Sequence, residues 1–217
     1  RAPQIAARAR ADEDLLGETL RAYGYYAGDV IRQLSGGRGA DGDGAGTGPG
    51  TGTGADEPGV SEPAVRFDVY PGARYAFGRV DLGGVARLRP EDAARLTAAF
   101  GIAPGDPLYA DDIVEGEISL KVALGESGYV FAKLTEPSLL IDHARAEGDL
   151  TLPVAPGGRY AFGEVSSSDP AFLSGGHLAR IARFAPGDLY QRSLETDLRR
   201  AIIATGLVSS VAITPRE

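Results

Sequence analysis

An internal repeat limits the folds that this chain can adopt. The pentapeptide RYAFG stands at residues 74–78 and again at 159–163. Behind each copy follow the same anchors in the same order: apolar residues at helical spacing, a Pro-Gly-Asp turn, a second set of apolar residues at helical spacing, and a glycine. The connections between these anchors differ in length, as they do between homologous folded modules, because loops accept insertions and cores do not. The sequence therefore predicts tandem modules with small cores.

The middle copy, residues 72–156, contains a complete set of predicted elements. A strand at the pentapeptide is followed by a helix that Pro90 begins and Gly101 ends. The turn at 104–106 leads into a second helix, and a hairpin closes the module. We therefore expect the order strand, helix, helix, strand, strand. The two hairpin strands are expected from 129 to about 143 and from 149 to 154.

Partial copies stand on both sides of the middle module. Residues 4–22 repeat the leucine spacing and the Gly-Tyr pair of its second helix, so they are predicted to be the last helix of a first module. Strands at 29–34 and 64–70 should follow, joined by a Gly-rich segment at 35–63 that is expected to be a disordered hairpin loop. The predicted domains are a partial first module at residues 1–71, a complete second module at 72–156, and a third module at 157–217 that lacks its last strand.

The composition argues against several classes of function. A formal net charge of −8 disfavours nucleic-acid binding, which depends largely on phosphate neutralisation. The chain has no cysteine, and its two histidines, His143 and His177, lie in different modules, so we expect no metal site and no cofactor. No Gly-x-Ser-x-Gly motif is present, and we expect no catalytic residues. No apolar run approaches the roughly 20 residues that a membrane-spanning helix requires.

The motifs and their order resemble those of the POTRA (polypeptide-transport-associated) domain. They are GARYAFGRV and GGRYAFGEV at the start of a module, PGD between its helices and, before its hairpin, spaced leucines followed by Gly-Tyr. The resemblance implies an α+β fold with tandem β-α-α-β-β modules, each with two helices packed on a three-stranded mixed sheet. Three modules with YGYY in the first are most similar to TamA-like outer-membrane assembly factors. The POTRA regions of two-partner secretion or BamA-type transporters are the alternative.

The repeated pentapeptide is interpreted as a structural motif. Its phenylalanine can supply bulk to a small core, and its glycine can permit a bulge or a close approach of a helix. A role in ligand contact is the weaker alternative. The residues concerned are Tyr75, Phe77, Gly78, Tyr160, Phe162 and Gly163.

The resemblance also implies a non-catalytic function that depends on exposed sheet edges. In each module the second strand would be an edge strand, at 29–34, 129–136 and about 207–213. Such an edge offers unpaired N–H and C=O groups to an incoming strand, although it can equally remain solvated. Lys133 is the expected site of an outward-facing amide, because a charged side chain guards an edge against uncontrolled pairing. The predicted partner-binding residues are Val130, Phe131, Ala132, Lys133 and Leu134.

The resemblance further implies partners and a location. The substrates would be unfolded outer-membrane proteins, the partner a TamB-like protein of the inner membrane and periplasm, and nucleic acid would not be bound. A membrane β-barrel outside this fragment would anchor the modules at the periplasmic face of the outer membrane.

Overall fold

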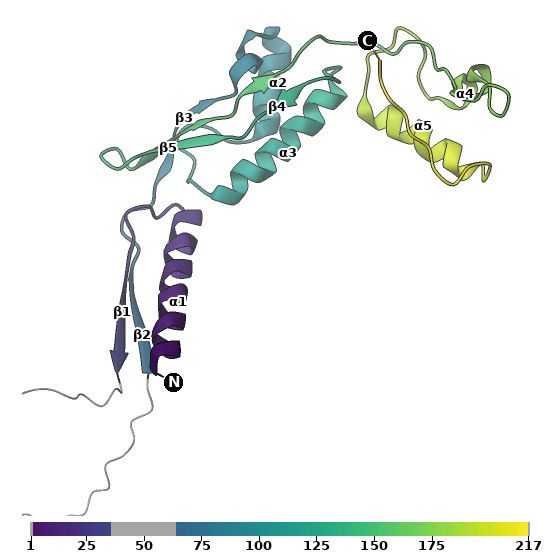
Figure 1. The fold of residues 1–217 in the computed structure, drawn as a ribbon. Helices are drawn as coiled ribbons and strands as arrows, with labels where there is room; N and C mark the ends of the chain where they lie inside the picture. Colours follow the sequence, from purple (N-terminus) through teal and green to yellow (C-terminus); the bar gives the residue numbers. More distant parts are fainter. Residues whose placement is uncertain (1, 36–63, 217) are drawn as a thin grey trace, which may run out of the picture. The chain divides into compact units, whose positions relative to one another are not determined.

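The computed structural model describes residues 2–35 and 64–216, which divide between Arg74 and Tyr75 into two compact units. Figure 1 shows the order of the elements along the chain. The loop predicted at 35–63 lies outside the described residues except for Ser35. None of the described helices is both long and apolar enough to cross a membrane.

The first unit consists of one helix and a two-stranded antiparallel sheet. Helix α1 (Ala2–Ala22) runs beside strands β1 (Asp29–Ser35) and β2 (Ala64–Tyr70), as Figure 1 shows. Gly24 follows the helix with a positive φ of 87°, and its neighbour Tyr25 donates an amide hydrogen bond to the Leu20 carbonyl (2.8 Å). The helix and both strands predicted for this part of the chain are therefore present.

The second unit begins with a complete β-α-α-β-β module. Its elements are β3 (Ala76–Asp81), the 3-10 helix η1 (Gly83–Arg87), α2 (Pro90–Phe100), α3 (Ala110–Glu126), β4 (Lys133–Leu134), β5 (Ser138–Asp142), β6 (Glu147–Thr151) and β7 (Val154–Ala155). The main sheet has the order β3-β6-β5, with β3 parallel and β5 antiparallel to β6. The short strands β4 and β7 pair with each other and extend the hairpin. The predicted α+β fold class with a three-stranded mixed sheet is thereby confirmed.

The core of this module is built from one face of the sheet and the apolar stripes of its helices. Along β6, Gly148 and Leu150 are buried while Glu147, Asp149 and Thr151 are not, as in a strand with one covered face. Along α3, the buried residues Ile113, Leu120 and Leu124 stand at helical spacing. The largest fully buried side chains are Phe77, Phe100, Leu96, Leu108, Leu120, Leu124, Leu150, Leu152 and Val85.

The pentapeptide and the Pro-Gly-Asp turn bind each other in both copies. The amide of Phe77 donates to the Asp106 carbonyl (2.8 Å), and the amide of Gly105 donates to the Phe77 carbonyl (2.7 Å). In the third module Phe162 makes the same two bonds, at 2.7 and 2.8 Å, with the turn at 186–188. Both turn glycines have a positive φ, 94° and 95°, a conformation that glycine adopts without a steric cost. The two motifs therefore recur together because each holds the backbone of the other.

The glycine that ends the pentapeptide has different surroundings in the two copies. The register between β3 and β6 shifts between Phe77 and Val80, as at a β-bulge. A Cβ atom at Gly78 would lie 2.5 Å from Asp149 Oδ1 of β6, whereas one at Gly163 would meet no atom within 4 Å. The close approach at Gly78 is thus to a neighbouring strand, and its counterpart has no such neighbour.

The third module contains helices α4 (Gly175–Ile181) and α5 (Arg192–Ala204) but no strand among its described residues. One isolated bridge joins Ala161 and Leu189. The edge strand predicted at about 207–213 is therefore wrong for this structure. In the middle module, β6 pairs with the strand on each side of it. Residues 157–216 include no counterpart of β6, so the segment at 207–213 has no strand with which to pair.

The apolar core of the third module is correspondingly open. Leu178, Leu198 and Ile202 form its buried cluster, and Phe162 stacks on Phe184 with ring centroids 3.7 Å apart. A cavity of about 760 Å³ lies against this cluster; its lining includes Val165, Leu173, Phe184, Val211 and Ile213.

Candidate peptide-binding edge

Strand β5 is the open edge of the three-stranded sheet. The opposite edge strand, β3, is partly covered, because the segment 105–108 bonds to its first half and to the preceding residue Tyr75. On the outer side of β5 the described residues place no further strand. An added strand would therefore find unpaired backbone groups at β5.

The hydrogen bonds of β6 determine which amides of β5 face outward. The carbonyl of Ala146, just before β6, accepts a hydrogen bond from the Ala76 amide (3.2 Å), and the amide of Leu152, just after β6, donates one to the Asp81 carbonyl (2.8 Å). Backbone groups alternate in direction along a strand, so the even-numbered residues of β6 face β3 and the odd-numbered residues face β5. The partners of these odd-numbered residues on β5 are Asp142, Leu140 and Ser138, whose backbone groups consequently face inward.

Leu139 and Ile141 therefore carry the outward-facing N–H and C=O groups of β5. No other residue of the described ranges bonds to these groups. Their side chains are half-buried, whereas Leu140 between them is 72% exposed. An incoming strand would thus pair with main-chain groups and lay its own side chains beside Leu140. The predictions from sequence missed these residues, although the apolar run Leu139-Leu140-Ile141 between Ser138 and Asp142 is compatible with a strand.

An ionic cluster fixes the turn between β5 and β6. Arg145 contacts Asp142 (2.7 Å), Glu147 (2.6 Å) and Asp149 (3.0 Å). The hydrogen bond from Arg145 lowers the pKa of Asp142, and the hydrogen bond from the main-chain amide of Arg79 lowers the pKa of Asp149. Both carboxylates are therefore ionised at neutral pH and hold the hairpin end in place. In the part of the chain that the structure describes, no group of acidic and histidine side chains could hold a metal ion.

The residues predicted to bind partners occupy two different environments. The strand predicted over 129–136 is wrong in extent: only Lys133 and Leu134 form a strand, β4, which pairs with β7. Ala132 donates to the Tyr129 carbonyl (3.2 Å), so a turn that includes Val130 and Phe131 precedes the strand. The turn is needed because the chain must reverse after α3 before it can join the hairpin. The amide of Thr135 donates to the carbonyl of Pro153, which directly precedes β7 (3.1 Å). Because amides alternate in direction along a strand, the Lys133 amide faces inward, towards β7, and the Leu134 amide faces outward, away from β7.

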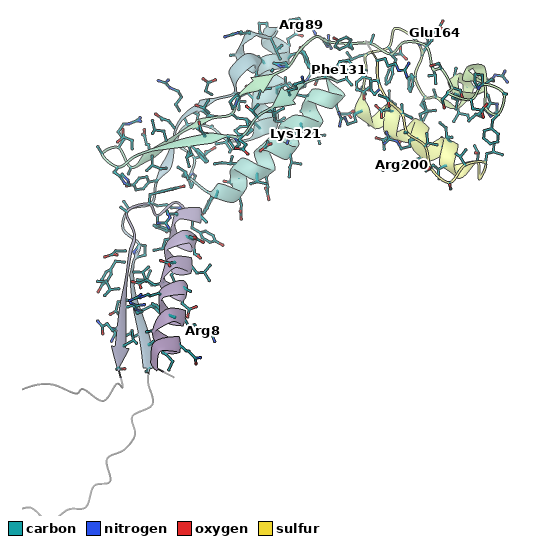
Figure 2. All side chains as sticks on the ribbon, in the orientation of Figure 1. Arg8, Arg89, Lys121, Phe131, Glu164 and Arg200 are labelled. Atoms are coloured by element: carbon teal, nitrogen blue, oxygen red, sulfur yellow. The ribbon has the colours of Figure 1, made fainter. Side chains whose placement is uncertain are left out.

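Phe131 belongs to a joint between the second and third modules, both of which lie in the second unit. Its ring meets that of Tyr160 edge to face, with centroids 5.1 Å apart, and Figure 2 labels it at the end of the hairpin that leads into the third module. Tyr160 donates its amide to the Gly128 carbonyl (2.8 Å), and Arg159 Nε donates to the Ser127 carbonyl (3.1 Å). The two residues that directly follow α3 are thus bound to the first residues of the next module.

A carboxylate at the end of α3 caps the first turn of α5. Glu126 accepts hydrogen bonds from the Ser193 amide (2.8 Å) and the Ser193 hydroxyl (2.7 Å). Gln191, the N-cap residue of α5, makes no side-chain capping bond. Glu126 therefore supplies from another module the anionic acceptor that a helix N-terminus favours.

A buried carboxylate in α2 links the same two modules. Asp92 is 3% exposed and accepts hydrogen bonds from the Tyr129 hydroxyl (2.8 Å), from Arg89 (2.9 Å) and from Arg95. Arg159 Nε of the third module lies 4.0 Å from it. Burial raises the pKa of Asp92, but the hydrogen bonds from Tyr129 and Arg89 with the charges of Arg89 and Arg159 outweigh it, so the pKa is lowered. Burial and the bond to Asp92 raise the pKa of Tyr129.

No family model matches the chain. It is 28% identical over 149 residues, 68% of its length, to the protein described as outer membrane protein assembly factor BamA from Neorickettsia risticii (strain Illinois), and it spans 19% of that relative. Among solved structures it is similar to Haemophilus influenzae BamA POTRA3-5, with a TM-score of 0.43, 20% identity and coverage of 88% of this chain and 66% of that one. A second structure is BamA from Haemophilus ducreyi lacking POTRA domains 1-3, with a TM-score of 0.48, 17% identity and coverage of 64% and 26%.

These relatives are BamA proteins, so the TamA-like resemblance stays a prediction. The paired motifs and the β-α-α-β-β order of the middle module are observed in this chain and do not depend on a comparison with other proteins. In sequence, the chain is similar over 68% of its length to a part of an outer-membrane protein assembly factor.

Proposed function

We propose that this chain is the non-catalytic periplasmic POTRA region of an outer-membrane assembly or translocation factor and that it binds extended polypeptides by adding a strand to β5. The open edge carries the proposal, because Leu139 and Ile141 present backbone groups that no other described residue uses. The sequence similarity to an assembly factor supports the substrate class, which is unfolded outer-membrane protein.

The proposed binding is weak at a single edge. Two outward-facing residues offer two donors and two acceptors, and a net contribution of about 0.5–1.5 kcal/mol for each bond gives roughly 2–6 kcal/mol. Association costs a comparable or larger amount, so one edge holds a peptide only transiently. Transient binding suits a factor that must pass its substrate on, and neighbouring modules raise the effective concentration of the bound chain.

The proposal is compatible with a whole protein that has a TamB-like partner and with one that has none. A TamA-like factor would have a TamB-like partner, whereas a BamA-type insertase or a two-partner secretion transporter would not. The sequence similarity to BamA favours the BamA-type alternative. Both alternatives include a membrane barrel outside this chain, and affinity capture from an envelope extract with this chain as bait distinguishes them by whether a TamB-like protein is retained.

Two substitutions at one position test the edge. Leu139→Pro removes the outward-facing amide together with the leucine side chain, whereas Leu139→Ala removes the side chain alone. In NMR titrations of the full chain with a strand-forming peptide of alternating apolar and polar residues, the alanine variant should bind like the parent and the proline variant should lose binding. Circular dichroism checks that both variants fold, and the pair Ile141→Pro and Ile141→Ala repeats the comparison where Leu139→Pro does not fold. Equal affinity of folded proline and alanine variants would move the binding site away from β5.

A further inference from the structure

Helix α3 carries an exposed apolar stripe that the sheet edge does not explain. Val114, Ile118 and Val122 follow each other at intervals of four residues and are 57%, 58% and 57% exposed. Residues four apart lie on one face of a helix, so the stripe extends over roughly 12 Å. Scattered apolar residues are normal on a protein surface, but three in line form a continuous apolar surface.

The POTRA fold does not require apolar residues at these positions. The leucine spacing aligns α3 with α5, where the counterparts of the stripe are Arg192, Thr196 and Arg200. The same alignment with α1 places Arg10, Asp14 and Glu18 there. The stripe is therefore specific to the middle module, and β-branched residues at exposed positions of a helix reduce its intrinsic stability slightly.

Carboxylates border the stripe. Asp111 and Glu115 lie on the helix surface beside Val114, and neither forms an ion pair with a residue of the described ranges. Lys121, the one lysine of α3, is bound to Glu117 (2.7 Å). The border of the apolar surface is thus negatively charged.

We propose that this face of α3, formed by Val114, Ile118, Val122, Asp111 and Glu115, docks an amphipathic helix of a partner protein whose apolar ridge is flanked by lysine or arginine. The occupant is a helix because the backbone groups of α3 are already bonded within the helix and offer no ladder to a strand. A helix satisfies its own backbone and packs its ridge against the stripe.

Charge selects this occupant over two others. A second copy of the chain would bring the same carboxylates against these, and an anionic lipid surface would repel them. Basic flanks, in contrast, complement Asp111 and Glu115.

Two designed peptides test the proposal with the full chain. Both are helical with leucine at intervals of three and four residues, and they differ only in flanks of lysine or of glutamate. We expect the lysine peptide to shift the NMR amide signals of residues 111–122 and to bind about tenfold more tightly than the glutamate peptide, with the difference reduced at high salt. Ile118→Lys should weaken the lysine peptide about tenfold, and Glu115→Lys should reduce the preference between the two peptides.

Leu207→Lys is the matched control, because Leu207 is an apolar residue outside α3 and β5 that is 57% exposed, like the residues of the stripe. It should leave both affinities unchanged. The proposal is overturned if neither peptide binds, if the flanking charge makes no difference, if the shifted signals lie outside α3, or if folded Ile118→Lys binds like the parent.

Discussion

Replacing Gly128 by alanine tests the joint between the second and third modules. Gly128 has a φ of 89°, and a Cβ atom on it would lie 2.7 Å from Leu189 Cδ1 and 3.0 Å from Arg159 Cγ, both in the third module. Gly101 ends α2 with a φ of 80°, and a Cβ there would meet nothing within 4 Å. The two glycines share a left-handed backbone in the same module, and only Gly128 faces the third module.

The two substitutions should therefore differ in cost. A left-handed backbone costs a non-glycine residue roughly 1–2 kcal/mol, which both alanine variants incur. Overpacking against the third module adds about 1–3 kcal/mol for Gly128→Ala alone. We expect Gly101→Ala to lower the free energy of unfolding by about 1–2 kcal/mol and Gly128→Ala by about 2–5 kcal/mol, as measured by urea denaturation followed by circular dichroism.

Amide hydrogen exchange separates a loosened joint from a weakened module. Tyr160 donates its amide to the Gly128 carbonyl (2.8 Å), so Gly128→Ala should accelerate exchange at Tyr160 and Gly101→Ala should not. Equal losses of stability, with unchanged exchange at Tyr160, would refute the tight packing at this joint.

Three further outcomes follow from other contacts. Gly78→Ala should destabilise the chain by about 1–3 kcal/mol in urea, because its Cβ would lie 2.5 Å from Asp149 Oδ1, an oxygen that the Arg79 amide holds at 2.8 Å. Gly163→Ala, at the equivalent position of the repeat, should be nearly neutral, because its Cβ would meet no atom within 4 Å. Folding lowers the pKa of Asp92, so the contribution of this carboxylate to stability is complete above the ordinary aspartate pKa of about 4 and is lost as the pH falls below that value. Asp92→Asn should therefore reduce the decline of the melting temperature at acidic pH. Glu126→Ala should accelerate amide exchange at Ser193 and cost about 1 kcal/mol, and an unchanged exchange rate would contradict the capping of α5.

The sequence was sufficient to predict the features that rest on local chemistry. The spacing of leucines and the Pro-Gly-Asp turns predicted the helices, and Gly128 has the left-handed backbone expected for a glycine that ends a helix. The direction of the amides could not be predicted, because alternation permits two phases and the turn after Gly128 decides between them. Lys133 consequently faces inward, contrary to the expectation.

Contacts between residues far apart in the sequence were equally beyond prediction. Glu126 and Ser193 meet only because the third module folds back onto the end of α3. Phe131 was expected in a partner-binding strand, yet the turn that contains it directs its ring towards Tyr160. An apolar residue in a short segment is compatible with both roles, and only the tertiary structure distinguishes them.

The residues that repeat and the residues proposed to bind are different, and this separation has a physical cause. The bonds that join Phe77 to its turn, and Phe162 to the turn at 186–188, are main-chain bonds that every module needs, so the motifs recur. The outer surface of a helix contributes little to the core, so Ile118 in one module can correspond to Thr196 in the next. Tandem modules can therefore keep one core and present different surfaces. Because a partner that one surface holds weakly is at high effective concentration for the next, several weak and different surfaces in a row can bind more tightly than any of them alone.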